Sequence, residues 1–380
     1  MSDFTSKCYS IQLPLFDFHT TRVSSFNEEE KTFFNYLATV ESLLTSEERT
    51  CLFSEPSIGR KGYSGFQIFS VLLLKSYLRC NTTREVLKIL RREPNYQFIL
   101  RFERDIPSEA SLSRRVKEFE KKIDICALHE RLTTAYYKDR LVCNLSIDST
   151  PIDAYEKPVK AKKKKKLKKG RKIKGSAEER EYQEKLKAEA EFDDLVKYGD
   201  IKKYLQTLEF RCSVAGKKNS KGNMDWRIGY KAHLAVDDNG IPVSYAVTGM
   251  SVHDVKLAIP LMRMADKRCI YLYTLMDSGY WSKKIANFTK EIGKVPVIDP
   301  KADRTGKKIE LEPARKERYK ARTTVERSNS ELKACYLPDH LHSRGYKARL
   351  DVELAILCLT MKRMRKILKK EQKFRQDKAA

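Results

Sequence analysis

The stretch Tyr319–Lys333 contains four side chains whose types and spacing could do chemistry. At intervals of 3, 4 and 7 residues, they are Tyr319, Arg322, Glu326 and Lys333. At about 100° per residue, one α-helix would present all four within an arc of roughly 60°. A carboxylate between two cations could bind a divalent metal ion while the cations neutralise phosphate oxygens. The spacing fits a solvated helix face with ordinary ion pairs equally well.

The same helix would also carry a stripe with which it could dock on a core. Ala321, Val325 and Leu332 lie about 110° from the charged face at helical spacing. The pattern therefore predicts a helix that packs with one stripe and displays charged groups beside it.

Two further carboxylates follow apolar runs of extended type. Asp148 follows residues 141–147, and Asp277 follows residues 270–276, with Gly279 expected to let the backbone turn sharply just beyond. An acid at the end of a buried strand can be catalytic, although Asp also often only begins a turn there. Three acids from separate elements could hold two divalent ions for an in-line phosphoryl displacement. Mg²⁺ is the expected ion, because it is hard and prefers oxygen ligands.

The net charge points to a nucleic acid as the partner, and the cysteine usage points to a reducing compartment. Lys and Arg total 77 against 51 Asp and Glu, which gives a formal net charge of +26. Such an excess attracts polyanions. A membrane surface is the competing partner, but the apolar runs are too short or interrupted to span a bilayer, and residues 1–16 lack a signal-peptide pattern. Nine scattered cysteines without a CxxC motif indicate reduced thiols rather than disulfides or zinc, and we expect a cytoplasmic, nucleoid-associated protein.

The first part of the chain has the pattern of several short helices. They are expected at about 27–47, from 64 to 77, at 82–92, at 96–102, and after a cap at Ser108 or Ser111. The last of them would carry Arg114 and Arg115 outward. The outline fits a helix-turn-helix DNA reader, and it fits a plain helical bundle with a basic surface nearly as well.

A lysine-rich tract interrupts the region between the two aspartates. It runs from Lys157 to Lys174 and includes Lys162, Lys163 and Lys164 in a run of five lysines. Such a block repels itself, so we expect it to be disordered when free and to follow DNA phosphates when bound. The alternative is a solvated tether. A charged helical pattern follows at 177–205.

Further elements complete the predicted catalytic region. They are a hairpin turn at Asn239-Gly240, a helix at 255–265, a strand at 295–298 and an amphipathic helix at 349–370. His233 and His253 are expected to be structural, because a lone His near a strand is more often a satisfied core group than a catalyst. Trp281 is expected in the core.

The order of these motifs closely resembles the DDE transposases of bacterial insertion sequences, particularly the group with a Tyr-Arg-Glu-Lys signature. The resemblance rests on IDST around Asp148, SVHD ending at Asp254, MDSGY around Asp277 and the spaced residues of 319–333, and it covers about 141–347. It implies an α/β fold, with a ribonuclease H-like catalytic core and an N-terminal all-helical DNA-binding domain. The implied divisions are 1–140, 141–347 with an insertion at about 157–225, and a C-terminal basic helix at 348–380.

The resemblance also implies a function and a set of roles. Asp148, Asp277 and Glu326 would be the catalytic metal ligands for two Mg²⁺ ions, with Mn²⁺ able to substitute. Tyr319, Arg322 and Lys333 would grip DNA phosphates. The protein would bind the ends of its element, cleave them and join the 3′-hydroxyls to target DNA, as a dimer or larger multimer. Alternatives are a transposase-derived DNA-binding protein without strand transfer and a Mg²⁺-dependent nuclease. Only 48 residues separate Asp277 from Glu326, which leaves open whether a DNA hairpin intermediate forms.

Overall fold

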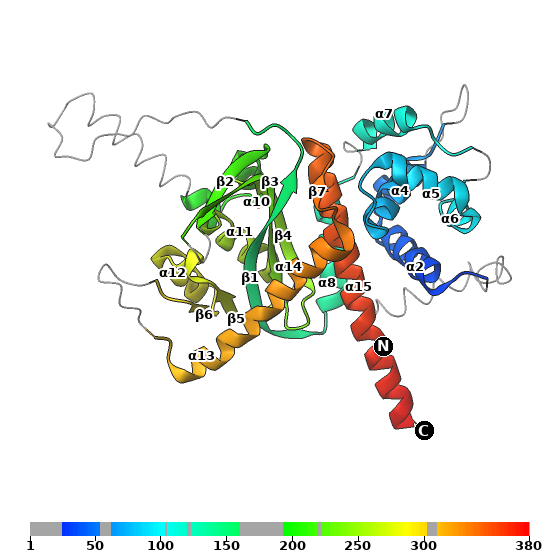
Figure 1. The fold of residues 1–380 in the computed structure, drawn as a ribbon. Helices are drawn as coiled ribbons and strands as arrows, with labels where there is room; N and C mark the ends of the chain where they lie inside the picture. The colour runs from blue at the N-terminus through cyan, green and yellow to red at the C-terminus, as the bar shows by residue number, and fades with distance from the viewer. Residues whose placement is uncertain are drawn as a thin grey trace.

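A helical region precedes a mixed α/β region in the chain (Figure 1). The computed structural model describes residues 25–53, 62–102, 105–119, 123–159, 193–218, 222–301 and 310–379. Most of the lysine-rich tract, including Lys162, Lys163 and Lys164, lies outside these ranges.

The described part of the N-terminal region consists of helices, as the apolar spacing predicts, although the separate helices Ser46–Phe53 and Ile125–Tyr137 were not among the predicted ones. They are α2 (Glu28–Leu43), α3 (Ser46–Phe53), α4 (Gly65–Tyr77), α5 (Thr83–Arg92), α6 (Pro94–Ile99), α7 (Glu109–Phe119) and α8 (Ile125–Tyr137). Side-chain caps define where several of them begin. Thr82 accepts a hydrogen bond from the backbone N–H of Glu85 at the start of α5, and Ser108 accepts one from Ser111 at the start of α7. The first of the two serines is therefore the cap of α7.

A seven-stranded mixed sheet forms the second region. Its strands are β1 (Leu141–Ala154), β2 (Ser213–Lys218), β3 (Met224–Val236), β4 (Pro242–Gly249), β5 (Ile270–Met276), β6 (Val295–Ile298) and β7 (His340–Leu341). β1, β3 and β4 pair antiparallel, whereas β5 and β6 continue the sheet in parallel beyond β1. The Asn239-Gly240 turn between β3 and β4 is confirmed, and Gly240 has the positive φ, 77°, that such turns require.

Strand β1 corrects one prediction from the sequence. Asp148 does not end its strand, because β1 continues to Ala154 while pairing with β3. The parallel pairing with β5, however, ends at Ile147 opposite Met276. Asp148 therefore lies in the interior of β1, one residue beyond its parallel pairing with β5.

Helices cover both faces of the sheet (Figure 1). Helices α11 (Val255–Asp266) and α12 (Lys283–Glu291) pack together on one face, and α14 (Thr323–Tyr336) and α15 (Tyr346–Ala379) pack over the other. Helix α10 (Ile201–Thr207) precedes β2. Residues 352–361 of α15 are buried, and this helix also packs on α4 and α8. The buried apolar side chains of both regions consequently form one continuous cluster.

The stretch Tyr319–Lys333 is not one uninterrupted α-helix. Helix α13 (Pro313–Tyr319) ends at Tyr319, a 3₁₀ turn η2 (Lys320–Arg322) follows, and α14 begins at Thr323. Val325 and Leu332 are nevertheless fully buried, so the docking stripe is confirmed within α14.

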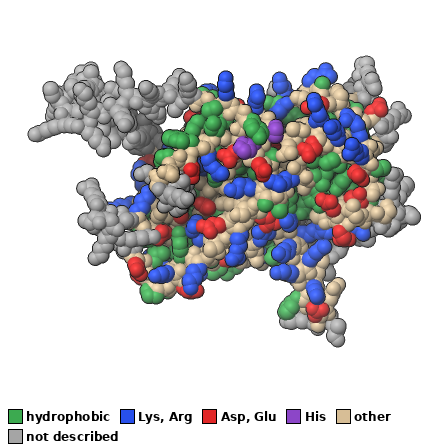
Figure 2. Space-filling model, viewed as in Figure 1, with side chains coloured by type: hydrophobic (Ala, Val, Ile, Leu, Met, Phe, Trp, Pro, Cys, Tyr) green, Lys and Arg blue, Asp and Glu red, His purple; other side chains and the backbone are tan. Residues whose placement is uncertain are grey.

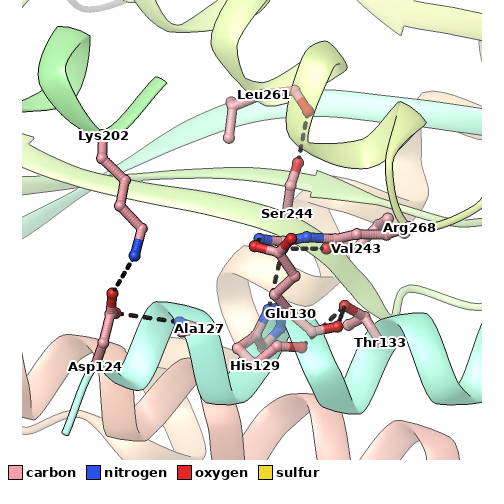
Figure 3. Close-up of polar contacts among 10 residues, drawn as sticks. All are labelled: Asp124, Ala127, His129, Glu130, Thr133, Lys202, Val243, Ser244, Leu261 and Arg268. Carbon is pink, nitrogen blue, oxygen red and sulfur yellow. Dashed lines mark hydrogen bonds and ion pairs between the residues drawn. The ribbon is translucent and has the colours of Figure 1, made fainter. Parts of the chain in front are cut away.

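A cluster of buried polar groups ties α8 to the sheet (Figure 3). Arg268, which is 3% exposed, donates to the carbonyl of Val243 at 2.8 Å, to the Glu130 carboxylate at 3.3 Å and to Nδ1 of His129 at 3.3 Å. Nδ1 must then be the acceptor, so Nε2 carries the proton and donates to Thr360 Oγ1 at 3.1 Å. Burial and the Arg268 charge hold the pKa of His129 well below its usual value. This ring is therefore neutral and joins α8 to α15.

None of the described helices combines the length and the apolar composition that a membrane span requires. Each of the eight cysteines in the described ranges is a free thiol, as the scattered spacing predicts.

Candidate active site

Strand register brings Asp148 and Asp277 side by side. Ile147 of β1 pairs with Met276 of β5 in parallel; Asp148 is the next residue of β1, and Asp277 is the residue that follows the end of β5. Asp277 also begins a turn, since its Oδ1 accepts from the Gly279 N–H at 2.9 Å at the start of η1 (Ser278–Tyr280). Asp277 is therefore both a candidate catalytic acid and the residue that starts this turn.

Gly279 is needed for space rather than for an unusual backbone angle. A Cβ atom at this position would lie 2.9 Å from Asp277 Oδ1, and Gly279 is not among the residues with positive φ. The expected sharp turn therefore rests on close approach of the backbone to the carboxylate.

The Asp148 carboxyl is electrostatically strained. Burial raises its pKa to about 6, and the neighbouring charges of Asp277 and Asp254 raise it as well, whereas the Ser149 backbone N–H and the Arg322 guanidinium act in the opposite direction. This carboxylate is ionised at neutral pH, and a positive charge placed beside it would stabilise it.

Arg322 connects the helical segment to the acids. Its guanidinium contacts the Glu326 carboxylate and lies 5.6 Å from the centre of the Tyr319 ring. Burial lowers the pKa of Arg322, but the charges of its neighbours, which include Asp148 and Asp277, raise it above its usual value. One cation thus acts on all three predicted catalytic acids.

Asp254, at the end of the SVHD motif, is a fourth acid beside this group. Lys231 Nζ donates to Asp254 Oδ1 at 2.8 Å, so its charge is balanced locally. His233 is fully buried, and its Nε2 lies 2.9 Å from Thr248 Oγ1. Burial lowers the pKa of His233 to about 3, which makes it a neutral structural group as predicted. His253 is exposed.

The acids do not form a closed cage for a metal ion. No three His, Cys, Asp or Glu side chains in the described ranges are close enough together to hold one, and Glu326 is engaged by Arg322 with half of its side chain exposed. The donor set still fits a divalent cation. Asp148 and Asp277 supply hard oxygen ligands that repel each other, and a cation between them would relieve that repulsion. Glu326 would join them by leaving Arg322.

Other predicted site residues lie apart from these acids. Lys333 is exposed on α14, about 10 Å along the helix axis from Glu326. Arg114 is exposed on α7, and Arg115 of the same helix pairs with Glu118 at 2.9 Å. The expected burial of Trp281 is wrong, because this side chain is 45% exposed just after η1.

Asn329 is a site residue that the sequence interpretation missed. Its Nδ2 donates to Asp148 Oδ2 at 3.1 Å. A signal was present, since Asn329 lies four residues after Val325 and three before Leu332, which places a polar side chain on the docking stripe. A polar group on such a stripe needs a partner when it is buried.

Comparison with known protein families gives one match. A family model described as the transposase DDE domain matches residues 200–361, which include Asp277 and Glu326 but not Asp148. No curated protein and no solved structure matches the chain at a significant level.

Proposed function

We propose, with the transposase DDE domain at residues 200–361 as the premise, that this protein cleaves the ends of an insertion sequence and joins them to target DNA. One observation carries the proposal. Asp148 lies outside the matched range, yet the pairing of β1 with β5 brings it beside Asp277. An acid predicted from a separate motif therefore reaches the position where a second metal-binding carboxylate is needed.

The strand arrangement supports a ribonuclease H-like core. Three antiparallel strands, β4, β3 and β1, are followed by the parallel strands β5 and β6. The acids come from the two central neighbours, β1 and β5, and from a helix on one face.

Each residue then has a distinct role. Asp148, Asp277 and Glu326 hold two Mg²⁺ ions, for which Mn²⁺ can substitute; when bound, these supply activation of the attacking oxygen and stabilisation of the leaving oxygen. Arg322 releases Glu326 and turns its charge to the phosphate. Tyr319 positions that guanidinium through its ring.

The DNA would extend over a basic surface. Lys and Arg side chains are spread across the face seen in Figure 2, with acidic side chains between them. Lys333 and Arg114 are exposed and would contact DNA phosphates, as would Arg115 after leaving Glu118 and the lysine-rich tract with Lys162, Lys163 and Lys164. The helical region 1–140 would bind element ends, the region 141–347 would catalyse, and 348–380 would add a basic helix. Two copies would act together on paired ends, because each end needs its own set of acids.

Substitution of the acids tests the proposal. Asp148→Asn, Asp277→Asn and Glu326→Gln should each lower Mg²⁺-dependent cleavage of the element's ends by at least about 1,000-fold, since each removes a metal ligand. Binding of uncleaved ends should stay within about threefold of wild type. Asp139→Asn, which changes an exposed carboxylate after α8, is the matched control and should cleave normally. Wild-type cleavage by any of the three variants would remove that residue from the site.

Strand transfer separates a transposase from the alternatives. Pre-cleaved ends with free 3′-hydroxyls, supplied with a supercoiled target plasmid and Mg²⁺, should give joined products. Cleavage without joining would favour a nuclease, and binding without either reaction would favour a transposase-derived DNA-binding protein.

A further inference from the structure

Asn329 couples helix α14 to the catalytic strand β1. Its side chain is 5% exposed, and the amide Nδ2 donates to Asp148 Oδ2 at 3.1 Å. Asn329 lies three residues after Glu326, so one turn of α14 carries both a predicted ligand and a direct hydrogen bond to another ligand.

The other polar atom of Asn329 has no partner. Oδ1 is buried and accepts no hydrogen bond from the described part of the chain. Leaving a buried acceptor unsatisfied typically costs about 1–3 kcal/mol, so native proteins seldom keep one without a reason. Exchanging the two amide atoms would not help, because Oδ1 would then face the Asp148 carboxylate. The unsatisfied atom lies beside a predicted ligand.

The Asn329 side chain is held in place from both sides. Val325 and Leu332 are fully buried about one turn before and after it. The neighbouring Ser328 hydroxyl lies 2.9 Å from the carbonyl oxygen of Gly240 and 3.0 Å from that of Thr324, which anchors α14 to the β3–β4 turn. The helix cannot rotate the amide away from Asp148 without breaking these contacts.

The two aspartates are fixed in the same manner. Asp277 Oδ1 accepts from the Gly279 N–H at 2.9 Å, as Asp148 Oδ2 accepts from Asn329. A neutral N–H donor orients a carboxylate without cancelling its negative charge, unlike the Lys231 ammonium on Asp254. Such support of ligands by neighbouring groups commonly changes metal affinity by 10–100-fold.

We infer that Asn329 is a positioning residue, which orients Asp148 for a divalent cation through Nδ2 and accepts a hydrogen bond from a water of that cation through Oδ1. The inference rests on the proposed function, because it assumes that Asp148 is a metal ligand. Its loss should weaken metal binding rather than DNA binding.

This role can be tested by titrating the whole protein with Mn²⁺ in the absence of DNA. Electron paramagnetic resonance reports the free Mn²⁺ and gives the Kd. Asn329→Leu keeps the branching of the side chain at a larger volume and removes both polar atoms, and it should raise the Kd for Mn²⁺ by roughly tenfold. Asn329→Ser, which is smaller and keeps a hydroxyl, should fall between this variant and wild type. Circular dichroism confirms that each variant is folded; if Asn329→Leu is not, the serine variant carries the test.

A matched control uses the same kind of bond elsewhere. Asn95 Nδ2 donates to both Glu30 carboxylate oxygens at 3.1 Å in the N-terminal region, so Asn95→Leu should leave Mn²⁺ binding unchanged. In cleavage assays, Asn329→Leu should need roughly tenfold more Mg²⁺ but approach the wild-type rate at saturation, which a general structural defect would not allow.

The outcomes separate the two levels of the proposal. Unchanged Mn²⁺ affinity in folded Asn329 variants, with weakened binding in Asp277→Asn, would overturn the role of Asn329 alone. Unchanged affinity in Asp148→Asn and Asp277→Asn as well would overturn the proposed metal site itself.

Discussion

The cluster around Arg268 and the acidic site around Asp148 both place charged groups inside the fold, but they treat charge in opposite ways. Arg268 is surrounded by acceptors from the protein itself, namely the Val243 carbonyl, the Glu130 carboxylate and neutral His129 (Figure 3). Asp148 instead faces another carboxylate, Asp277, which adds to its repulsion. In the first cluster the protein supplies acceptors for both terminal nitrogens of Arg268, although its buried Nε has no hydrogen-bond partner among the described residues, whereas the second cluster would be stabilised by a cation.

The contrast indicates which region serves stability and which serves function. A buried cation with fitted acceptors fixes the packing of α8 on the sheet, and removing it would leave those acceptors without a donor. A buried carboxylate beside a second one lowers the stability of the metal-free protein. Such a loss of stability is typical of functional sites, where the same two carboxylates can bind a cation. Four substitutions test the contrast.

Arg268→Met should be the most destabilising change. It removes the donor to Val243, Glu130 and His129, and each buried acceptor that is left without a donor typically costs about 1–3 kcal/mol. Urea unfolding of the metal-free protein measures the effect. Lys202→Met is the control, because it removes only the exposed ion pair with Asp124 and should cost less than about 1 kcal/mol. Equal effects would show that the Arg268 cluster does not stabilise the fold.

Asp148→Asn should have the opposite sign and stabilise the metal-free protein. At a pH well below 3.8, the usual pKa of the carboxyl, this group is protonated in both the folded and the unfolded states. As the pH rises to about 6, the Asp148 carboxyl ionises first in the unfolded chain, because its pKa is raised in the folded protein. The unfolding free energy of wild type therefore falls by up to about 3 kcal/mol, whereas that of the variant does not. Unfolding free energies measured between pH 4 and 7 should therefore diverge, and parallel curves would contradict the strain on Asp148.

Arg322→Gln should have a smaller effect on stability and a clear effect on activity. It removes the partly buried pair with Glu326 and a charge that lowers the pKa of Asp148. We expect a loss of about 1 kcal/mol in unfolding free energy and at least a tenfold loss in cleavage rate. Lys320→Gln, which removes the exposed ion pair between Lys320 and Glu317, is the control. It should change the unfolding free energy by less than about 0.5 kcal/mol and the cleavage rate by less than about twofold.

Trp281→Ala should destabilise the fold much less than truncation of a core tryptophan would. A core tryptophan would cost about 3–5 kcal/mol on truncation, but this one is 45% exposed, and we expect less than about 2 kcal/mol. Differential scanning calorimetry provides the measurement. A core-sized loss would mean that Trp281 is buried in solution.

Local patterns were sufficient to predict many elements but not where all of them end. Strands β5 and β6, the hairpin at Asn239-Gly240 and the buried face of α14 follow from apolar periodicity and turn chemistry. The length of β1 could not be predicted from such local patterns, because its extension beyond Asp148 depends on pairing with β3 and β7. The 3₁₀ turn after Tyr319 has no comparable signal in the residues themselves.

The predicted acids were easier to find than the groups that orient them. Asp148 and Asp277 follow apolar runs that are visible in the sequence, and their proximity follows from parallel pairing. The bond from Asn329 to Asp148 joins residues 181 positions apart, so it depends on how α14 docks. The contact of Arg268 with His129 likewise joins residues far apart in the sequence, and it depends on how α8 packs against the sheet.

The position of α15 has a consequence for how the protein is made. This 34-residue helix packs on α4, α8 and α14, so a segment translated after these three helices supplies part of the surface on which they are buried. A nascent chain in which α15 has not yet been made exposes those apolar faces, and it lacks the α15 packing against α14. The proposed DNA cleavage should therefore begin only after α15 has been made and packed, and chains truncated before α15 should be removed by proteolysis rather than nick DNA.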